Sequence, residues 1–251
     1  MNIFRSEKFQ KIFYPIFYLV FTVAITISGC FIFNRYYYTN IFVSGPSMMP
    51  TLIGDDNKNV HHYGIADTTS AAINGLERFD VVITYYPDEW NARNGLIVKR
   101  VWGFPGEKLV LASDAEKSTF TVYHGEEEIY NITAQAEDYE FYKISTDSYE
   151  TWQTYSFNVG KRHFHTRKKM EGASYGRSFN YTLGDNEYFV MGDNWGDSTD
   201  SYMRYHYTQK LTKNYIQGKV ICIQGYGKVI QDTDNNYQIV EKHKINPIYF
   251  F

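Results

Sequence analysis

The chain has 251 residues, enough for one or two domains with a sizeable hydrophobic core, and its formal net charge of −3 excludes the strongly basic surface typical of a nucleic-acid-binding protein. Its two cysteines and seven histidines show no spacing typical of a structural metal site, so we expect neither a metal nor a cofactor. Five histidines are interpreted as surface residues: His61, His62, His163, His165 and His206.

Residues 12–33 form the only long apolar stretch, with 22 residues and no charged side chain. As a helix they cover roughly 33 Å at ~1.5 Å per residue, enough to cross the hydrocarbon core of a bilayer. Residues 1–40 contain four basic residues and one acidic residue, whereas the remainder contains 21 basic and 27 acidic residues. Because basic residues mark the cytoplasmic side of a span, we expect residues 1–36 to be a cytoplasmic N-terminus and a single-pass anchor, with the remainder outside.

Two other interpretations of this stretch stay open. A cleaved signal peptide would have a shorter apolar core and small residues at its exit, but here the apolar run continues to Phe33. Residues 27–30 fit the short pattern after which bacterial lipoproteins are cut and lipidated at cysteine. The apolar residues that follow Cys30 argue against lipidation, so a spanning anchor is preferred.

The stretch SGPSMMPTL, residues 44–52, contains a candidate nucleophile, Ser47. A serine in such a loop more often caps or solvates a turn. Ser47 lies about 14 residues beyond the apolar stretch, so even a fully extended chain keeps it within roughly 50 Å of the bilayer. The following residues, 53–77, are polar and interrupted by glycine, and they indicate little strand structure.

Residues 78–87 and 96–103 predict two strands rich in β-branched and apolar residues. Neighbours in a strand point to opposite faces, so one of Lys99 and Arg100 must point into apolar surroundings. Burial lowers the pKa of a lysine, and a shift from about 10.4 to about 8 raises its neutral fraction at pH 7 from ~0.04% to ~10%. A neutral Lys99 could accept the proton of Ser47. The alternative is a surface lysine on an edge strand.

Residues 111–186 are rich in Thr, Tyr and Glu and contain short alternating runs, which indicate a separate insert. A further strand then runs into a turn at residues 188–201 that is dense in Gly, Asp, Asn and Ser. This turn is either a plain tight loop or a set of polar groups that orient Lys99, with the Ser198 hydroxyl and the Asp200 carboxylate as partners. Residues 216–223 predict a last core strand.

Three stretches occur together behind the apolar segment: SGPSMMPTL at 44–52, IVKRVWGFPGE at 97–107 and FVMGDNWGDSTDS at 189–201. In these motifs and their order the chain resembles the bacterial type I signal peptidases, over roughly residues 12–110 and 186–225. The resemblance implies that Ser47 attacks the scissile carbonyl and that Lys99 is the general base. It also implies supporting roles for a set of residues after the last motif's strand: Gly192, Asp193, Asn194, Ser198 and Asp200.

The resemblance further implies that the Ser47 backbone N–H donates to the oxyanion. Some family members carry a hydroxyl two residues before the nucleophile, where this chain has Gly45, so the second oxyanion donor stays open. The implied fold is mainly β: a signal-peptidase-like β-sheet catalytic core with an inserted smaller β cap, preceded by one transmembrane helix. The expected divisions are residues 1–36 for the anchor, 37–110 and 187–235 for the core, 111–186 for the cap and 236–251 for a tail.

The expected substrates are exported precursor proteins with an N-terminal signal peptide, cut at the outer face of the bacterial cell membrane. The expected partners besides these precursors are the lipid bilayer and the secretion translocon, with no nucleic acid. An extended substrate segment would lie along the strands near 80–85 and 97–99 by β-addition, with small side chains admitted by tight pockets. The residues proposed to bind substrate are Met48, Leu52, Asp80, Val82, Ile97 and Val98.

Trp195 and Tyr202 stand where arginine is usual in the family. They motivate a second hypothesis, a catalytically weak or inactive signal-peptidase-like assembly factor for surface proteins. The presence of both Ser47 and Lys99 favours the enzyme. A self-cleaving repressor with similar chemistry would need a DNA-binding domain before Ser47, where the apolar stretch lies.

Overall fold

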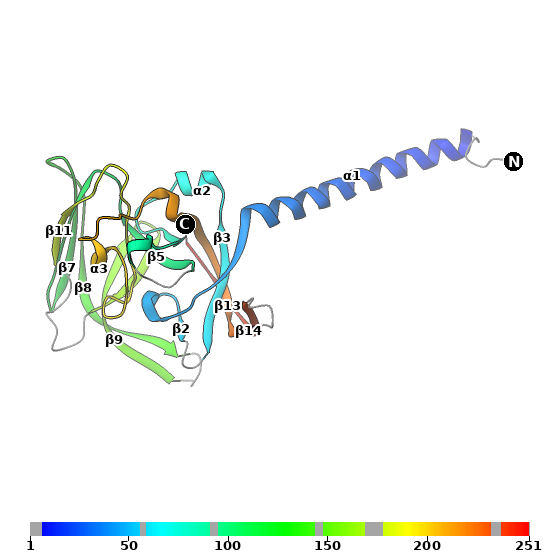
Figure 1. The fold of residues 1–251 in the computed structure, drawn as a ribbon. Coiled ribbons are helices and arrows are strands. Elements are labelled where there is room, and N and C mark those ends of the chain that lie inside the picture. Colours follow the sequence, from blue (N-terminus) through cyan, green and yellow to red (C-terminus); the bar gives the residue numbers. More distant parts are fainter. Residues whose placement is uncertain are drawn as a thin grey trace. The chain divides into compact units, whose positions relative to one another are not determined.

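The computed structural model describes residues 7–55, 59–90, 95–143, 148–168, 178–231 and 237–250. The fold is mainly β, with two antiparallel sheets and one long N-terminal helix (Figure 1). The chain divides into two compact units, residues 1–39 and residues 40–251. The predicted fold class, a β protein preceded by one apolar helix, is therefore confirmed.

The first unit consists mainly of helix α1 (Glu7–Tyr37). Its segment Gln10–Tyr37 has a mean hydropathy of 2.3 in its most apolar window, and it is long and apolar enough to cross a membrane. The stretch predicted to span, residues 12–33, lies within this helix. Its large side chains, such as Phe31 and Leu19, are exposed in the isolated chain, as expected for a helix whose apolar surface contacts lipid.

The main sheet of the second unit has the strand order β1-β3-β13-β4-β5-β12, with β14 paired to β13 and β2 paired to β3. Strand β5 therefore lies inside the sheet, between β4 and β12. The strands of this sheet are β1 (Tyr38–Phe42), β2 (Gly54–Asp55), β3 (Val60–Asp67), β4 (Val81–Thr84), β5 (Ile97–Gly103), β12 (Phe189–Met191), β13 (Ile216–Gln231) and β14 (Tyr237–Tyr249).

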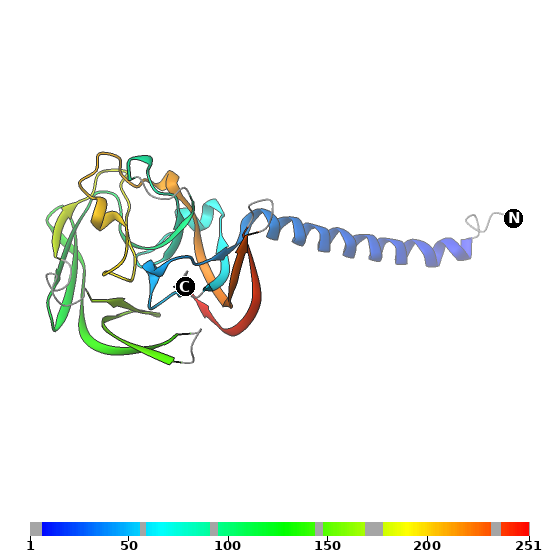
Figure 2. The ribbon, with the colours of Figure 1, turned by 60° about the horizontal axis from the view of Figure 1, so that its bottom comes forward.

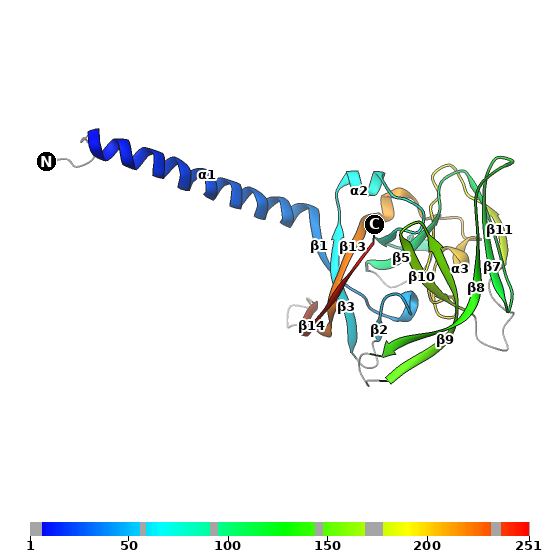
Figure 3. The same cartoon turned by 180° about the vertical axis from the view of Figure 1, so that it is seen from behind.

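The second sheet has the order β10-β9-β8-β7-β6-β11. Figures 1 and 3 show β7, β8 and β11 at one end of the unit and β3, β13 and β14 at the other. All its residues fall between 107 and 182, close to the predicted insert, yet both sheets belong to one compact unit, so the domain boundaries stay a prediction. Its strands are β6 (Glu107–Ser113), β7 (Lys117–His124), β8 (Glu127–Lys143), β9 (Ser148–Val159), β10 (Arg162–Arg167) and β11 (Phe179–Thr182).

Short helices connect the strands of the second unit. They are the α-helices α2 (Ser70–Asn74) and α3 (Ser201–Arg204) and the 3₁₀ turns η2 (Pro46–Met48), η3 (Asp88–Trp90) and η4 (Lys213–Tyr215). Helix α2 begins at the Thr69 cap, whose side chain accepts from the Ala72 N–H at 3.1 Å. Helix α3 begins at the Asp200 cap.

An aromatic cluster forms the largest core of the β unit. Trp102 is fully buried and meets Phe120 edge-on at a ring-centroid distance of 5.0 Å. Aromatic side chains of this size dominate the burial energy of a core, and edge-to-face pairs add about 0.5–1.5 kcal/mol each. Trp195 is 2% exposed within the same cluster, and Tyr202 packs against it. The two departures from the usual arginines therefore contribute apolar packing here.

The structure corrects the expectation for residues 53–77. This segment contains β2, α2 and the eight-residue strand β3, which pairs with β13 deep in the sheet. The sequence of β3, VHHYGIAD, mixes histidine and glycine and so lacks the alternation that predicts a strand. His61 and His62 are buried, at 4% and 6% exposed, and so is His165, which contradicts their assignment to the surface.

The C-terminal tail is also a strand. In β14, Tyr249 pairs with Cys222 and Tyr237 with Gln231 along β13, which itself extends eight residues beyond the predicted end at 223. Figure 2 shows this hairpin in orange and red beside the cyan strand β3. Tertiary pairing with β13, rather than any apolar alternation of its own, accounts for the order of this polar segment.

Candidate active site

Ser47 lies in the 3₁₀ turn η2, which joins β1 to β2. Pro46 is the first residue of the turn, where its missing N–H is not needed. Gly45 precedes it at φ 77°, a conformation that side-chain-bearing residues rarely adopt. This conformation explains why the position two residues before Ser47 is glycine and not a residue with a hydroxyl. Position 45 therefore supplies no side-chain donor to the oxyanion.

Two histidines of β3 hold the ends of the nucleophile loop, residues 43–53. The ring Nδ1 of His61 lies 2.8 Å from the Val43 carbonyl oxygen, and the Ile53 N–H donates to Nδ1 of His62 at 3.2 Å. The backbone adds bonds from Val43 N to His62 O and from His62 N to Ile53 O, each of 2.8 Å. Burial lowers the pKa of His62 to about 4, so its ring stays a neutral acceptor at physiological pH. The sequence did not predict these contacts of His61 and His62 with the two ends of the loop.

Lys99 projects from β5 toward the loop. Its Nζ lies 2.7 Å from Ser47 Oγ and donates to the Val98 carbonyl at 3.0 Å. The side chain is buried, and this desolvation lowers the pKa of Lys99 to about 8, although the charges of Asp200 and Asp193 act in the opposite direction. The structure thus brings together the two side chains singled out as nucleophile and base, with the amine in surroundings that favour its neutral form.

A loop after β12 holds the nucleophile turn from the other side. The backbone N–H of Asn194 donates to the Ser47 carbonyl at 3.0 Å, and its Nδ2 donates to the Pro46 carbonyl at 3.0 Å. A Cβ on Gly192 would lie 2.3 Å from the Ser47 carbonyl oxygen and 2.3 Å from Ser198 Oγ, so only glycine fits at this position. Gly192 and Asn194 therefore contact the turn that carries Ser47 through its backbone.

A buried ion pair joins the base strand to this loop. Arg100 donates to both carboxylate oxygens of Asp193, from Nε at 2.8 Å and from Nη2 at 2.6 Å. Both side chains are at most 2% exposed, and Arg100 also donates to the Phe79 carbonyl at 2.8 Å. Because Arg100 follows Lys99 and Asp193 precedes Asn194, the pair couples the positions of Lys99 and Ser47. The sequence predicted that one of Lys99 and Arg100 is buried, and the structure shows that both are.

The structure places Ser198 and Asp200 differently with respect to Lys99. The Ser198 Oγ is buried and makes no hydrogen bond within the described part of the chain, so the predicted contact with the Lys99 amine is absent there. The Asp200 carboxylate accepts from the Gly192 N–H at 3.0 Å and from the Tyr202 N–H at 3.1 Å. Asp200 therefore fixes the Gly192 backbone and caps α3, and it reaches Lys99 through its charge.

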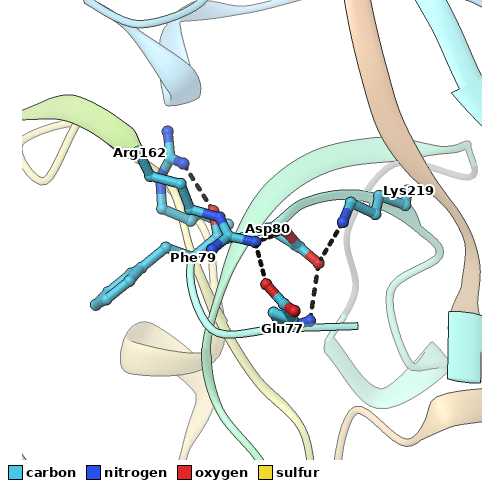
Figure 4. A network of polar contacts seen from close by, with 6 residues as sticks. Glu77, Phe79, Asp80, Arg162 and Lys219 are labelled. Atoms are coloured by element: carbon cyan, nitrogen blue, oxygen red, sulfur yellow. Dashed lines mark hydrogen bonds and ion pairs between the residues drawn. The ribbon is translucent and has the colours of Figure 1, made fainter. Parts of the chain in front are cut away.

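Asp80 and Val82 are not placed to bind a substrate. Figure 4 shows Asp80 between two cations: its Oδ1 meets Arg162 Nη2 at 2.8 Å, and its Oδ2 meets Lys219 Nζ at 3.0 Å. The Glu77 N–H also donates to this carboxylate at 2.8 Å. Val82 is fully buried in β4, which is paired on both edges, by β13 and β5. The sheet order, which no local pattern reveals, leaves β4 without a free edge.

The other predicted substrate residues belong to the Ser47 loop and to the start of β5. Met48 and Leu52 are buried in one apolar cluster, and Val98 packs against its edge half-exposed. Strand β12 pairs with β5 only from Arg100 to Gly103, so within the residues described Ile97 and Val98 have a strand partner on the β4 edge alone. These residues therefore offer a strand edge next to an apolar cluster.

The described residues contain no group of three or more His, Cys, Asp or Glu side chains placed to hold a metal ion. The site is thus built from one hydroxyl, one buried amine and the groups that position them. Such a Ser/Lys pair can perform acyl transfer when the amine is neutral, because it can then accept the hydroxyl proton.

Comparison with known proteins identifies the family. The family model described as signal peptidase, peptidase S26, matches residues 14–224, which is more than half of the chain. No curated protein gives a significant match. Members of this family are serine peptidases that act on exported precursors. The chain therefore belongs to the S26 signal peptidase family, the serine peptidases that remove signal peptides from exported proteins.

Proposed function

We propose that the protein is a membrane-anchored endopeptidase in which Ser47 is the nucleophile and neutral Lys99 is the general base. The single observation that carries this proposal is the 2.7 Å separation of Lys99 Nζ and Ser47 Oγ. This is within the reach required of a base and its nucleophile.

The chemistry follows from the positions of these groups. Neutral Lys99 accepts the Ser47 proton while Oγ attacks the scissile carbonyl carbon, and the resulting ammonium returns that proton to the leaving amine. A water then attacks the acyl-enzyme and gives a proton to Lys99, which passes that proton to Ser47 Oγ as the ester bond breaks, so that the free acid leaves and both side chains are regenerated. With a pKa of about 8, roughly a tenth of Lys99 is neutral at pH 7. The Ser47 N–H is the proposed oxyanion donor.

The substrate is proposed to bind as an extended segment along the edge of β5 at Ile97 and Val98. Backbone pairing there would supply affinity, and apolar contact at half-exposed Val98, beside the buried cluster of Met48 and Leu52, would select small side chains. Asp80 is left out because Arg162 and Lys219 hold its carboxylate, and Val82 because β4 has no free edge.

Helix α1 is proposed to anchor the enzyme in the bacterial cell membrane, with the N-terminus in the cytoplasm and the β unit outside. Its length and hydropathy support a span, and Arg5, Lys8 and Lys11 support the orientation. The substrates' own signal helices would then be embedded in the same bilayer, beside the secretion translocon.

The alternative of an inactive assembly factor was motivated by Trp195 and Tyr202. Both side chains pack with the aromatic cluster, so their presence has an explanation that leaves the Ser/Lys pair intact. No observation favours the inactive form.

The proposal is tested with the full chain in lipid vesicles and a signal-bearing precursor. Ser47→Ala and Lys99→Ala should each abolish cleavage, while the exposed-site controls Ser178→Ala and Lys228→Ala should cleave normally. Folding is checked for every variant by near-ultraviolet circular dichroism, which reports the aromatic core. Cleavage that persists in a folded Ser47→Ala variant would show that another group is the nucleophile.

A further inference from the structure

Two histidines on β10 face each other outside the Ser/Lys site. His163 and His165 are two residues apart on one strand, so their side chains point to the same face. Their Nε2 atoms lie 3.0 Å apart, and the two rings are nearly perpendicular, at 86°.

The other nitrogen of each ring meets an oxygen. His165 Nδ1 lies 3.2 Å from Glu137 Oε1 and 3.4 Å from Thr154 Oγ1, and His163 Nδ1 contacts Asn158 Oδ1. A carboxylate or an amide oxygen only accepts hydrogen bonds, so these partners favour the tautomers with the proton on Nδ1. Each Nε2 atom then carries a lone pair, and the two nitrogens lie 3.0 Å apart.

This arrangement matches metal-binding histidines. A ligating histidine usually donates its other ring N–H to a carboxylate or carbonyl oxygen, which fixes its tautomer and orientation. Two bonds of ~2.0–2.1 Å, the usual zinc–nitrogen length, span the observed 3.0 Å when they enclose roughly a right angle. We propose that His163 and His165 bind a divalent transition-metal ion of the class that prefers imidazole, such as Zn²⁺.

The surroundings fit an accessible site with two protein ligands. Tyr139 stacks on the His165 ring at a centroid distance of 3.7 Å and limits its rotation. His165 is 7% exposed whereas His163 is exposed, so the ion can enter from solvent and keep water in its remaining positions. Since the described residues supply no cluster of three ligating side chains, the affinity should fall below that of structural zinc sites.

The strand that carries the pair also contacts the active-site loops. The Thr51 hydroxyl donates to the His165 carbonyl at 3.4 Å, and the Arg167 N–H donates to the Asp193 carbonyl at 2.8 Å. A metal ion on β10 would therefore bind a strand that contacts both active-site loops, without using Ser47 or Lys99. Metal binding that favours the folded state should also raise the melting temperature.

The test is a zinc titration of the full Ser47→Ala chain in detergent, treated with chelator and freed of any affinity tag. This variant makes the result independent of the proposed peptidase mechanism. Isothermal titration calorimetry should show one Zn²⁺ per chain. His163→Gln and His165→Gln should each weaken binding at least tenfold, and Glu137→Gln about tenfold, the usual effect of losing a residue that orients a ligand. The matched controls His206→Gln and His243→Gln, both at exposed sites, should bind normally.

Two results would overturn the proposal: no saturable zinc uptake, or uptake that survives His163→Gln. Nitrogen-15 NMR of the metal-free protein gives a second check, because a proton on His163 Nε2 would identify an ordinary hydrogen-bonded pair. If buried His165→Gln fails to fold, the exposed His163→Gln variant decides alone.

Discussion

The two side chains of the proposed catalytic pair are held by different kinds of structure. Lys99 lies in an interior strand, fixed by backbone pairing with β4 and by burial. Ser47 lies in an irregular loop whose backbone forms hydrogen bonds with His61, His62 and Asn194, residues that lie outside the loop. The base therefore depends on desolvation, and the nucleophile on a few directional contacts. The two positions should respond differently to mutation and pH.

The largest effect is expected at the base. Lys99→Met should lower turnover by about 10²–10⁴-fold, the usual contribution of a general base. The same change should stabilise the protein at pH 7 by up to roughly 3 kcal/mol, since the pKa of Lys99 is lowered from 10.5 to about 8 by burial. Below pH 8 the buried Lys99 is charged, and wild type loses the full desolvation free energy. This loss of stability decreases as pH rises from 8 to 10.5, where the amine is neutral in the folded state. Thermal unfolding of wild type and variant across this range measures it.

The control for this prediction is Lys228→Met at an exposed ion pair, which should change stability little. If Lys99→Met gives the same stability difference from wild type at pH 7 and at pH 10.5, the amine is not desolvated and the comparison of base and nucleophile fails.

The second largest effect is expected from loss of the Arg100–Asp193 ion pair, which connects the Lys99 strand to the loop beside Ser47. Asp193→Ala leaves the buried Arg100 charge without its carboxylate, which should cost about 3–5 kcal/mol of unfolding free energy. Glu77→Ala is the matched control, because it removes a 66%-exposed partner of Arg162 and should cost under about 1 kcal/mol. Urea unfolding followed by tryptophan fluorescence compares them. Equal losses would contradict the buried-pair argument.

The pH dependence of cleavage tests whether desolvation of Lys99 controls the rate. Only neutral Lys99 can accept a proton, so kcat/KM should fall about tenfold for each pH unit below the pKa of about 8 and level off above it. At pH 6 the rate should be about a hundredth of its plateau. The measurement uses a peptide substrate without titrating groups near the cut. A profile that stays flat from pH 8 to pH 6 would exclude Lys99 as the base.

The smallest effect is expected at the loop. His62→Leu removes the acceptor of the Ile53 N–H and should cost about 1–3 kcal/mol, whereas His62→Gln can supply an oxygen and should restore part of it. The loss should appear in kcat more than in KM, because the substrate edge on β5 is untouched. His206→Leu, at an exposed site, is the control. A wild-type kcat in His62→Leu would show that the hydrogen bond between His62 and Ile53 does not position Ser47.

Much of the β core could be predicted from local pattern. Residues 81–84 and 97–103 are apolar and β-branched runs, and both are strands. Strand β3 was not predicted because its histidines and glycine interrupt the alternation of apolar and polar residues. Strand β14 was not predicted because its residues are polar and mostly exposed. Both are ordered by pairing with β13, which is distant in sequence. A strand whose stability comes from its neighbours carries little signal of its own.

The sequence alone determined the apolar segment, the mainly β fold and the choice of Ser47 and Lys99, because these depend on residue type, short spacing and motif order. Tertiary structure decided which groups surround them: it turned His61 and His62 inward, paired Arg100 with Asp193, and buried Val82 in an interior strand. The physical reason is that hydrogen bonds and burial depend on which distant segments lie side by side. Sheet order sets that arrangement, and no local pattern encodes it.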